Sequence, residues 1–310
     1  MVYLPAMFSV LPRVAKALSL GLPVVALESA VITHGLPKPE NLQLARDLES
    51  IIKDEGATPA TIAILDGIIH IGLSADDLEQ LASAPNTRKI SRRDYPLAVA
   101  QKLTGGTTVA GTLIAARMAG ISVFATGGIG GVHRGNQVDI SADLPELGRT
   151  PLAVICSGAK AILDLPATLE YLETNGVLVI GYQTDEFPAF YSRNSGLKLD
   201  TRVDTVEELA DIIRVQRSMG FQSAILITQP PPAEVDISPE ILESYVQKAL
   251  EQAKAANISG PAVTPYLLEQ VKINSGGTSL ITNLALLKQN AKLAAQIAVA
   301  LSSNTKFPSI

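Results

Sequence analysis

An α/β fold, with layered α/β/α architecture and a mixed but largely parallel central sheet, is the fold class that the sequence predicts. Short apolar runs alternate with amphipathic, helix-like segments along most of the 310 residues. Several of these runs are apolar throughout, which is typical of strands covered on both faces. Two of the runs are joined by Asp66-Gly67, a dipeptide that favours a tight antiparallel hairpin, so the sheet should be mixed.

The expected strands are short and rich in β-branched residues. They cover 23–29, 121–127, 152–158, 177–183 and 223–229, and two further runs lie within 61–73. In α/β sheets, the residues that follow such strands gather at one edge of the sheet, where ligands bind. Those residues are therefore the first place to look for a functional site.

The expected helices are recognised by apolar residues at helical spacing and by their end signals. One begins around Pro39 and stops at Gly56, and another follows Ser74, with Asp77 three residues on as in a capping box. Further helices are expected at 107–119, 159–174, 205–219, 238–256 and 261–274, with a long C-terminal helix at 278–302.

The chain is interpreted as a single α/β catalytic domain over 1–310, since no repeat, low-complexity tract or clear linker divides it. Residues 1–20 are expected to form an N-terminal tail or helix, with an organelle-targeting segment as the alternative. The proline-rich segment 229–240 is expected to be a loop within the domain. No uncharged apolar run is long enough for a membrane helix, so we expect no membrane partner.

Composition narrows the function classes. The net charge of −5 argues against a nucleic-acid partner, which more often selects a basic protein. The single cysteine, Cys156, excludes an internal disulfide framework and fits a reducing compartment, so we expect a cytoplasmic protein. The three histidines, at positions 34, 70 and 133, lie far apart and lack the spacing of a zinc site.

Charged groups follow the first expected strands. Glu28 comes directly after the apolar run 23–27, where a carboxyl group could act as a general acid or base, or could cap backbone amides. Four cations then lie within six residues, and any of them could bind a phosphate; a solvated surface loop is the alternative. These cations are Arg88, Lys89, Arg92 and Arg93.

The segment 126–144 places five glycines, His133 and two aspartates after an apolar strand. It matches neither a P-loop nor a complete dinucleotide-binding glycine motif, but its glycines would let a ligand approach the backbone closely. Asp139 and Asp143 are four residues apart and could share a helical face that holds Mg²⁺ or Mn²⁺. A helix cap at Asp139 or Ser141 is the alternative.

Lys160 comes shortly after the expected strand 152–158, near the start of an expected helix. A lysine among apolar groups and close to the positive end of a helix can lose its proton and add to a carbonyl carbon as a Schiff base. A lysine that extends to solvent from a helix end is the alternative. Taken together, the carboxyl group, the cations, the aspartates and the amine fit a phosphorylated sugar whose anomeric carbon can open to an aldehyde.

Long motifs in a fixed order then carry a resemblance to a known family. They read ALESAVITHGLPKPEN, GATPATIAILDGIIHIGLS, KISRRD, TTVAGT, VFATGGIGGVHRG, DISADL, SGAKAILDLPATLEYLET, GYQTDEFPAFY, TPYLL and GGTSLITNLALL. From about residue 10 to 302 the chain resembles the pseudouridine-5'-phosphate glycosidases, or pseudouridylate synthases, which are indigoidine synthase A-like proteins. The resemblance implies a lyase, grouped with the carbon–oxygen hydro-lyases, that reversibly cleaves pseudouridine 5'-phosphate to uracil and ribose 5-phosphate during nucleobase catabolism.

The resemblance also implies roles for individual residues. In the family's scheme the ribose ring opens and a lysine forms a Schiff base at C1'; this nucleophile corresponds to Lys160, and the proton donor corresponds to Glu28. Asp139 corresponds to the metal-binding aspartate. The substrate-binding positions correspond to Lys89, Val109, His133, Ser141, Ala142, Asp143 and Asn283.

Cofactor and partners follow from the same resemblance. It implies Mn²⁺, or another divalent ion such as Mg²⁺, and a homotrimer whose substrate is supplied by a separate pseudouridine kinase. Two other functions remain open from the residues alone. One is a Schiff-base aldolase or lyase acting on another sugar phosphate, which would share Lys160 but need no uracil pocket. The other is a non-catalytic sugar-phosphate sensor.

Overall fold

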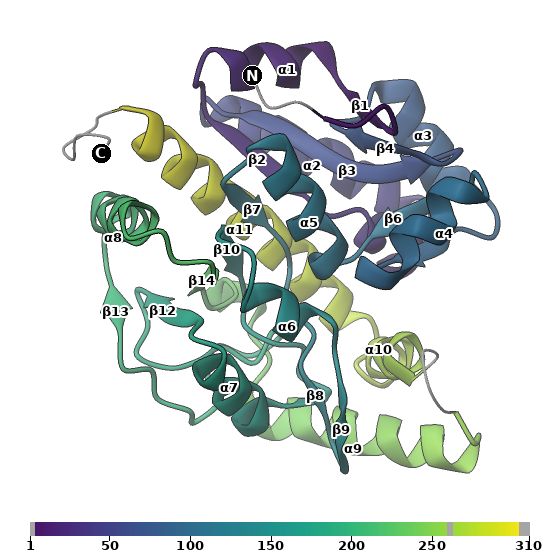
Figure 1. The fold of residues 1–310 in the computed structure, drawn as a ribbon. Helices are drawn as coiled ribbons and strands as arrows, with labels where there is room; N and C mark the ends of the chain where they lie inside the picture. Colours follow the sequence, from purple (N-terminus) through teal and green to yellow (C-terminus); the bar gives the residue numbers. More distant parts are fainter. Residues whose placement is uncertain (1–3, 259–262, 304–310) are drawn as a thin grey trace.

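A mixed, largely parallel sheet forms the centre of the fold, which confirms the predicted fold class. The computed structural model describes residues 4–258 and 263–303, apart from the side chains of residues 136 and 137. The spatial strand order is β1-β4-β3-β2-β7-β10-β14-β12-β13, and β6, with β5 beside it, branches from β3 (Figure 1). The strands are β1 (Phe8–Val10), β2 (Val24–Leu27), β3 (Thr58–Leu65), β4 (Ile68–Ile71), β5 (Arg88–Ile90), β6 (Gly105–Thr107), β7 (Val123–Ala125), β10 (Ala153–Cys156), β12 (Leu178–Tyr182), β13 (Arg202–Val203) and β14 (Ile225–Thr228).

The antiparallel pairs of this sheet both involve β3, which pairs with β4 and β6 in that sense. The predicted hairpin at Asp66-Gly67 is confirmed, because both residues have positive φ angles, 48° and 80°. Such a turn twists with the right-handed twist of the flanking strands. A Cβ atom on Gly67 would lie 2.8 Å from the Cα of Lys102, so the packing also requires a glycine there.

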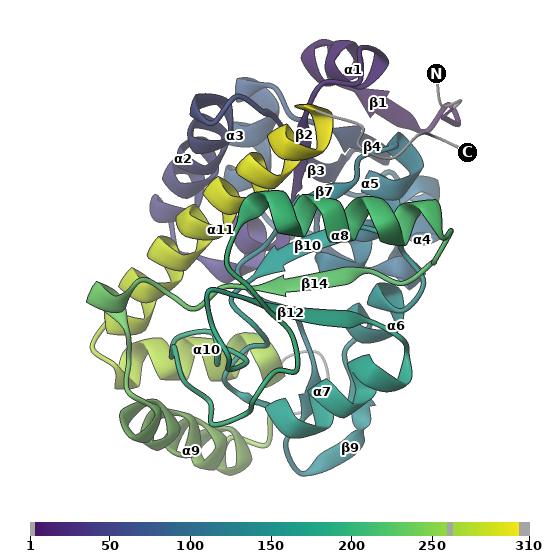
Figure 2. The same cartoon turned by 90° about the vertical axis from the view of Figure 1, so that its left-hand side faces the viewer.

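Helices cover both faces of the sheet, as Figures 1 and 2 show. On one face α11 packs against β7 and β10 and lies between α2 and α8; α5, α6 and α7 follow one another on the other face. The helices are α1 (Pro12–Ser19), α2 (Glu40–Asp54), α3 (Ala75–Ser83), α4 (Tyr95–Ala100), α5 (Val109–Ala119), α6 (Asp143–Leu147), α7 (Leu165–Thr174), α8 (Val206–Ser218), α9 (Pro239–Ala255), α10 (Val263–Asn274) and α11 (Thr278–Ser303).

A second, three-stranded sheet is a feature that the sequence did not suggest. It consists of β8 (Val132–His133), β9 (Asn136–Ile140) and β11 (Leu163–Asp164), in the order β11-β8-β9 with antiparallel pairing. Figure 1 shows it at the bottom of the molecule, beside α9 and α10. Its strands are too short for a periodic pattern, and their pairing joins segments about 30 residues apart in the chain.

Two predicted elements need correction. The helix expected at 159–174 begins only at Leu165, where Asp164 accepts a hydrogen bond from the Ala167 amide as its cap. Residues 1–20 form a strand as well as a helix, β1 and α1, and residues 1–3 lie outside the described residues. The first two residues of the helix expected at 261–274 also lie outside them. The capping box at Ser74 and Asp77 is confirmed.

The hydrophobic core is continuous through the layers and includes residues from Val14 in α1 to Ala298 in α11. Cys156, the last residue of β10, is fully buried within it, with a free thiol. Among the described residues, no helix combines the length and the apolar character needed to cross a bilayer.

The strand order reverses between β2 and β7. The chain leaves β2 through α2 and reaches β3 on one side, whereas β7, added later, pairs with β2 on the other side. Ligands of α/β proteins bind at the carboxyl ends of the strands at such a switch point. The residues directly after Leu27 and Ala125 therefore occupy the expected position of a site.

Candidate active site

Glu28 lies at this switch point, directly after β2. The hydroxyl of Thr126, the first residue after β7, donates a short hydrogen bond to its carboxylate. Ser29 fixes the backbone beside it, because the Ser29 hydroxyl donates to the carbonyl of Ile62 (2.5 Å) and accepts from the amide of Thr107 (3.0 Å). The carboxyl group of Glu28 is therefore held in one place by two neighbouring strands.

Burial raises the pKa of Glu28 above its ordinary value of 4.5. Lys160, the hydroxyl of Thr126 and Lys89 act in the opposite direction, while Asp143 adds to the rise. A carboxyl group with a raised pKa keeps its proton closer to neutral pH, as a general acid must.

The four clustered cations have different surroundings in the structure. Arg88 donates two hydrogen bonds to Asp94, at 3.0 and 2.7 Å, and Arg92 donates two to Glu146, both at 2.7 Å. Lys89 instead lies within electrostatic range of Glu28, Asp143 and Lys160, and desolvation together with the charge of Lys160 lowers its pKa. Arg93 is exposed at the surface. Lys89 is thus the cation of this cluster whose charge acts on Glu28.

Lys160 lies within electrostatic range of both Glu28 and Lys89, so the structure brings the carboxyl group and two amines together. Its backbone amide donates to the carbonyl of Ile129 (3.2 Å), and its carbonyl accepts from the amide of Leu163 (3.0 Å). The expectation that Lys160 lies at a helix start is wrong, because α7 begins five residues later. The nearby ammonium group of Lys89 is the positive charge that the structure places beside it.

Asp143, the first residue of α6, connects the loops around these charges. Its carboxylate accepts hydrogen bonds from the amides of Ala110 (2.9 Å) and Gly130 (2.8 Å). Within the described part of the chain, the amide of Val109, the first residue of α5, donates to no acceptor, so it can donate to an anion. Ser141 and Ala142 precede Asp143 in the loop between β9 and α6.

The glycines of the segment 126–135 are explained largely by protein contacts. A Cβ atom on Gly128 would lie 2.5 Å from the ring of Phe190. At Gly130 it would meet the hydroxyl of Ser141, and at Gly131 that of Thr168. Close packing of the loops therefore requires these glycines, whether or not a ligand also approaches them.

Asp139 and Asp143 do not share a helical face, which corrects that expectation. Asp139 lies on β9, exposed, whereas Asp143 opens α6 and uses both carboxylate oxygens for backbone amides. Among the described residues, no three His, Cys, Asp or Glu side chains are grouped as a metal site. Asp139 offers one exposed carboxylate, and a hard divalent ion such as Mn²⁺ or Mg²⁺ can be held by one or two carboxylates when water completes its shell.

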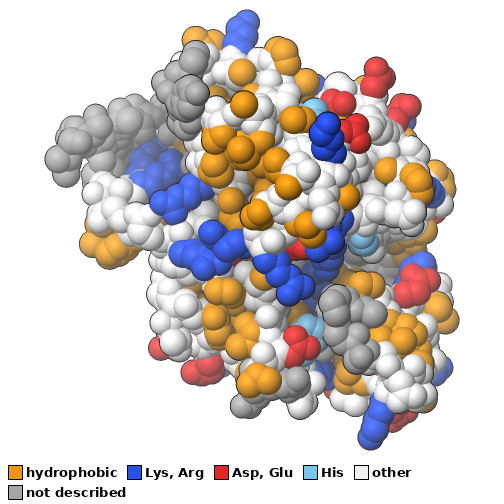
Figure 3. Space-filling model, turned by 45° about the vertical axis from the view of Figure 1, so that its right-hand side comes forward, with side chains coloured by type: hydrophobic (Ala, Val, Ile, Leu, Met, Phe, Trp, Pro, Cys, Tyr) orange, Lys and Arg blue, Asp and Glu red, His pale blue; other side chains and the backbone are white. Residues whose placement is uncertain are grey.

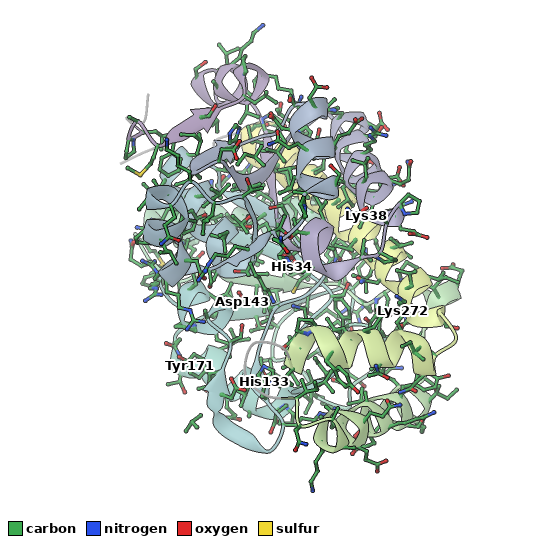
Figure 4. The ribbon with its side chains drawn as sticks, turned by 90° about the vertical axis from the view of Figure 1, so that its right-hand side faces the viewer. His34, Lys38, His133, Asp143, Tyr171 and Lys272 are labelled. Atoms are coloured by element: carbon green, nitrogen blue, oxygen red, sulfur yellow. The ribbon has the colours of Figure 1, made fainter. Side chains whose placement is uncertain are left out.

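His133 and Asn283 make no hydrogen bond or ion pair with Glu28, Lys89 or Lys160 among the described residues, so their place in the site stays a prediction. His133 is on β8, half-buried, with Nε2 3.5 Å from the hydroxyl of Thr264 in α10. Figure 4 labels His133 and Asp143 on the same side of the molecule. Asn283 lies in the second turn of α11. Figure 3 shows Lys and Arg side chains gathered across the middle of the face that it draws.

Two polar residues near Glu28 were missed. Thr126 follows β7 just as Glu28 follows β2, so the same rule of position would have found it. Asn290, fully buried in α11, donates to the carbonyl of Thr126 (2.9 Å) and to the hydroxyl of Ser157 (3.1 Å). It lies about two helical turns after Asn283 on the same helix face. A lone asparagine in an apolar helix carries no signal of this role.

The fold and the site define an α/β enzyme with a buried carboxyl group and two amines at its strand ends. Residues 13–300 match the family model described as indigoidine synthase A like protein, and the chain belongs to that family. The pseudouridine-5'-phosphate glycosidase of Geobacillus kaustophilus is 53% identical over 292 residues, which are 94% of this chain and 97% of the relative. That of Dinoroseobacter shibae is 50% identical over 305 residues, 98% and 100% of the two chains.

Solved structures show the same likeness. The crystal structure of an indigoidine synthase A-like protein from Thermotoga maritima has a TM-score of 0.88 and 36% identity, over 97% of this chain and 99% of that one. The prealnumycin C-glycosynthase AlnA, solved in complex with ribulose 5-phosphate, has a TM-score of 0.89 and 38% identity, over 97% and 98%. The predicted family is therefore confirmed.

Proposed function

We propose that this protein is a lyase that reversibly cleaves the carbon–carbon glycosidic bond of pseudouridine 5'-phosphate, with water, to uracil and ribose 5-phosphate. Relatives that are about half identical over nearly the whole chain bear the name of this activity. The observation that carries the proposal is the grouping of Glu28, Lys89 and Lys160 at the switch point of the sheet. A carbon leaving group needs covalent help beyond acid catalysis, and an amine nucleophile offers it.

We assign the bond changes as follows. The amine of Lys160 adds to C1' of the ribose as the bond from C1' to the ring oxygen breaks, and that oxygen takes up a proton. The nitrogen lone pair then forms a Schiff base while the bond from C1' to C5 of uracil breaks. Glu28 gives the proton that C5 needs. Water finally hydrolyses the Schiff base, which releases ribose 5-phosphate and the free amine.

The sugar phosphate fits the anion-binding groups beside this cluster. The amide of Val109 opens α5, and Lys89 brings a positive charge to the same region. Ser141 and Ala142 would line the loop over the phosphate. The hydrogen bonds that two backbone amides donate to Asp143 hold that loop against α5 and the glycine-rich segment. His133 and Asn283 would complete the substrate-binding set.

A divalent ion, Mn²⁺ or Mg²⁺, would be held by Asp139 and water. When bound, it would supply positive charge near the substrate's oxygens. We further propose a homotrimer in the cytoplasm, supplied with substrate by a separate kinase that phosphorylates pseudouridine. The free, buried thiol of Cys156 suits a reducing compartment.

A related carbon–carbon reaction on another pentose phosphate is the second candidate. It is favoured by the likeness to a C-glycosynthase whose crystals contain ribulose 5-phosphate. That reaction would use the same amine and the same phosphate-binding residues, but a different group would be bonded to the anomeric carbon of the sugar.

Uracil release tests the proposal. The protein is incubated with pseudouridine 5'-phosphate and Mn²⁺, and uracil is followed by chromatography. Borohydride added with ribose 5-phosphate should reduce a Schiff base to a stable adduct on Lys160, and Lys160→Ala should give neither uracil nor adduct. Turnover of another sugar phosphate without uracil release would favour the second candidate, and an undiminished adduct in Lys160→Ala would reject that nucleophile.

A further inference from the structure

Arg134 lies in the turn between β8 and β9, and its guanidinium makes three hydrogen bonds. Nε donates to the carbonyl of Leu163 (3.1 Å), Nη2 donates to that of Ala161 (3.0 Å), and Nη1 donates to the carboxylate of Glu243 in α9 (2.7 Å). The two carbonyls belong to residues 161–163, the end of the turn and the start of β11, which directly follow Lys160. Arg134 therefore joins the backbone next to Lys160 to a helix from a distant part of the chain.

Other contacts also hold the backbone on both sides of Lys160, including a bridge between Ala159 and Ile129. The backbone amide of Lys160 donates to the carbonyl of Ile129, and the carbonyl of Lys160 accepts from the amide of Leu163. The short strand β11 pairs with β8 through Leu163 and His133. The side chains of Ala161 and Leu163 are buried, and removing the guanidinium would take one hydrogen-bond donor from each of their two carbonyls. The loss of these donors destabilises the present position of residues 161–163, and the segment can regain hydrogen-bond partners by moving.

We propose that Arg134 is a positioning residue, which acts through the backbone of residues 161–163 to aim the amine of Lys160 at the anomeric carbon. The inference rests on the proposed function of Lys160 and deepens it. Only arginine has the planar fork that can serve two carbonyls and a carboxylate at once; lysine is a single point of charge. Glu243, which also accepts from Gln247 (2.6 Å), in turn sets the direction of that fork.

A cavity of about 350 Å³ adjoins this ion pair and offers a sharp test. Arg134, Ala161, Leu163 and Glu243 line it, together with Ser192, a fully buried residue. When Arg134 is replaced by alanine, the space of its side chain would open into this cavity. A small guanidinium compound could then occupy the vacated position and donate to the same carbonyls.

The experiment compares Arg134→Ala, Arg134→Lys and Glu243→Gln with Arg202→Ala, whose arginine forms exposed ion pairs with Asp185 and Asp204 on another loop. A displacement of about 1 Å at a reacting group costs on the order of 100-fold. We therefore expect Arg134→Ala to lower kcat by about 10–100-fold, with KM within about threefold, and to slow adduct formation at Lys160 equally. Millimolar methylguanidine should restore part of kcat.

The controls separate positioning from folding. Arg134→Lys should fold and have a kcat between those of the wild type and Arg134→Ala. Glu243→Gln should lose less kcat than Arg134→Ala, and Arg202→Ala should keep the wild-type kcat. If wild-type protein releases uracil and forms the adduct while folded Arg134 variants keep full kcat, the positioning role is rejected and the proposed function stands. A loss of kcat in a folded Arg134→Ala protein that methylguanidine does not restore also rejects it. If the wild type releases no uracil, both proposals fail.

Discussion

Glu28 and Thr126 meet across β2 and β7, and this contact makes the acid–base behaviour of the site testable at the level of one hydroxyl group. The hydrogen bond from Thr126 stabilises the carboxylate form of Glu28 and so works against the rise in pKa that burial causes. The proton donor must be protonated in the free enzyme. Activity should therefore fall as the pH rises through the pKa of Glu28.

We predict that Thr126→Val, which keeps the shape of the side chain, moves this fall in kcat/KM to higher pH. The reason is that the carboxylate loses a donor, so its pKa rises further. The measurement is kcat/KM for uracil release against pH, which reports the ionisations of the free enzyme. Glu28→Gln should abolish this limb of the profile. If the fall in kcat/KM does not move in Thr126→Val, or if it persists in Glu28→Gln, the ionisation behind it belongs to a residue other than Glu28.

Asp139 offers a second prediction for a single residue. Asp139→Asn should weaken Mn²⁺ binding by about tenfold or more, because the neutral amide loses the charge that a hard divalent ion needs from the protein. Binding is followed by the electron paramagnetic resonance signal of free Mn²⁺, independently of activity. Asp76→Asn, which changes an exposed aspartate at the start of α3, is the matched control. Equal Mn²⁺ binding by both variants would point to a different ligand.

Some of these residues could be predicted from the sequence and others could not, depending on whether their partners lie nearby in the chain. Glu28 could be found because a charged residue directly after an apolar strand is conspicuous. The distinction between Lys89 and its neighbours could not be found, since it depends on how side chains pair in the fold. Arg88 pairs with Asp94, and Arg92 pairs with Glu146, a residue far along the chain. Asn290 could not be found either, because its partners are backbone and side-chain groups more than 130 residues away.

At the scale of elements, the short helix α6 depends on a buried carboxylate. Glu146 is fully buried and accepts hydrogen bonds from Arg92 (2.7 Å), Thr150 (2.7 Å) and Arg149 (2.9 Å). Burial alone would raise the pKa of Glu146, but these donors outweigh it and hold the pKa below its ordinary value of 4.5. The network fixes α6 and, with it, Asp143 at the site.

We predict that Glu146→Gln lowers the free energy of unfolding by about 1–3 kcal/mol at neutral pH, less than for a fully buried ion pair because both arginines are half exposed. The measurement is urea unfolding. Because the folded-state pKa is depressed, this stabilisation is complete above pH 4.5 and is lost as the pH falls through that pKa. The difference between the two proteins should therefore shrink in acid. A difference that does not depend on pH would assign the loss to packing.

Elements with long periodic patterns were predicted well, and short ones were not. The residues of α2, α8 and α11 repeat often enough to reveal a helix, whereas β8 and β11 have two residues each. The error at Lys160 has the same cause. Residues 159–164 form a turn and a strand only because β8 is available to pair with Leu163, and that partner is invisible in the local sequence.

At the scale of the whole molecule, apolar side chains remain exposed on the helices near the carboxyl edge of the sheet. Ile273 in α10 is 58% exposed and Ile281 in α11 is 59% exposed. Exposed apolar groups of this size are common at contacts between subunits. The layered arrangement itself was predicted from the alternation of strands and helices, but packing between copies leaves no periodic pattern in one chain.

We predict a particle of three times the chain mass of 32.6 kDa in light scattering coupled to size-exclusion chromatography. Ile273→Asp and Ile281→Asp should shift the mass toward one chain if these helices form the contact, because burying a carboxylate in an apolar interface is costly. Thr174→Asp, an exposed change on α7, serves as the control. A single-chain mass for the wild type at micromolar concentration would exclude the trimer.

The burial of Cys156 makes site-specific thiol labelling of this protein straightforward. This residue lies at the centre of the sheet, and burial raises the pKa of its thiol to about 12, so it offers almost no thiolate to an alkylating reagent. A cysteine introduced at an exposed position, such as Met219 at 60% exposure, would be the only reactive thiol in the folded chain. The native protein is thus already a background for attaching one spectroscopic label per subunit, with no residue removed first.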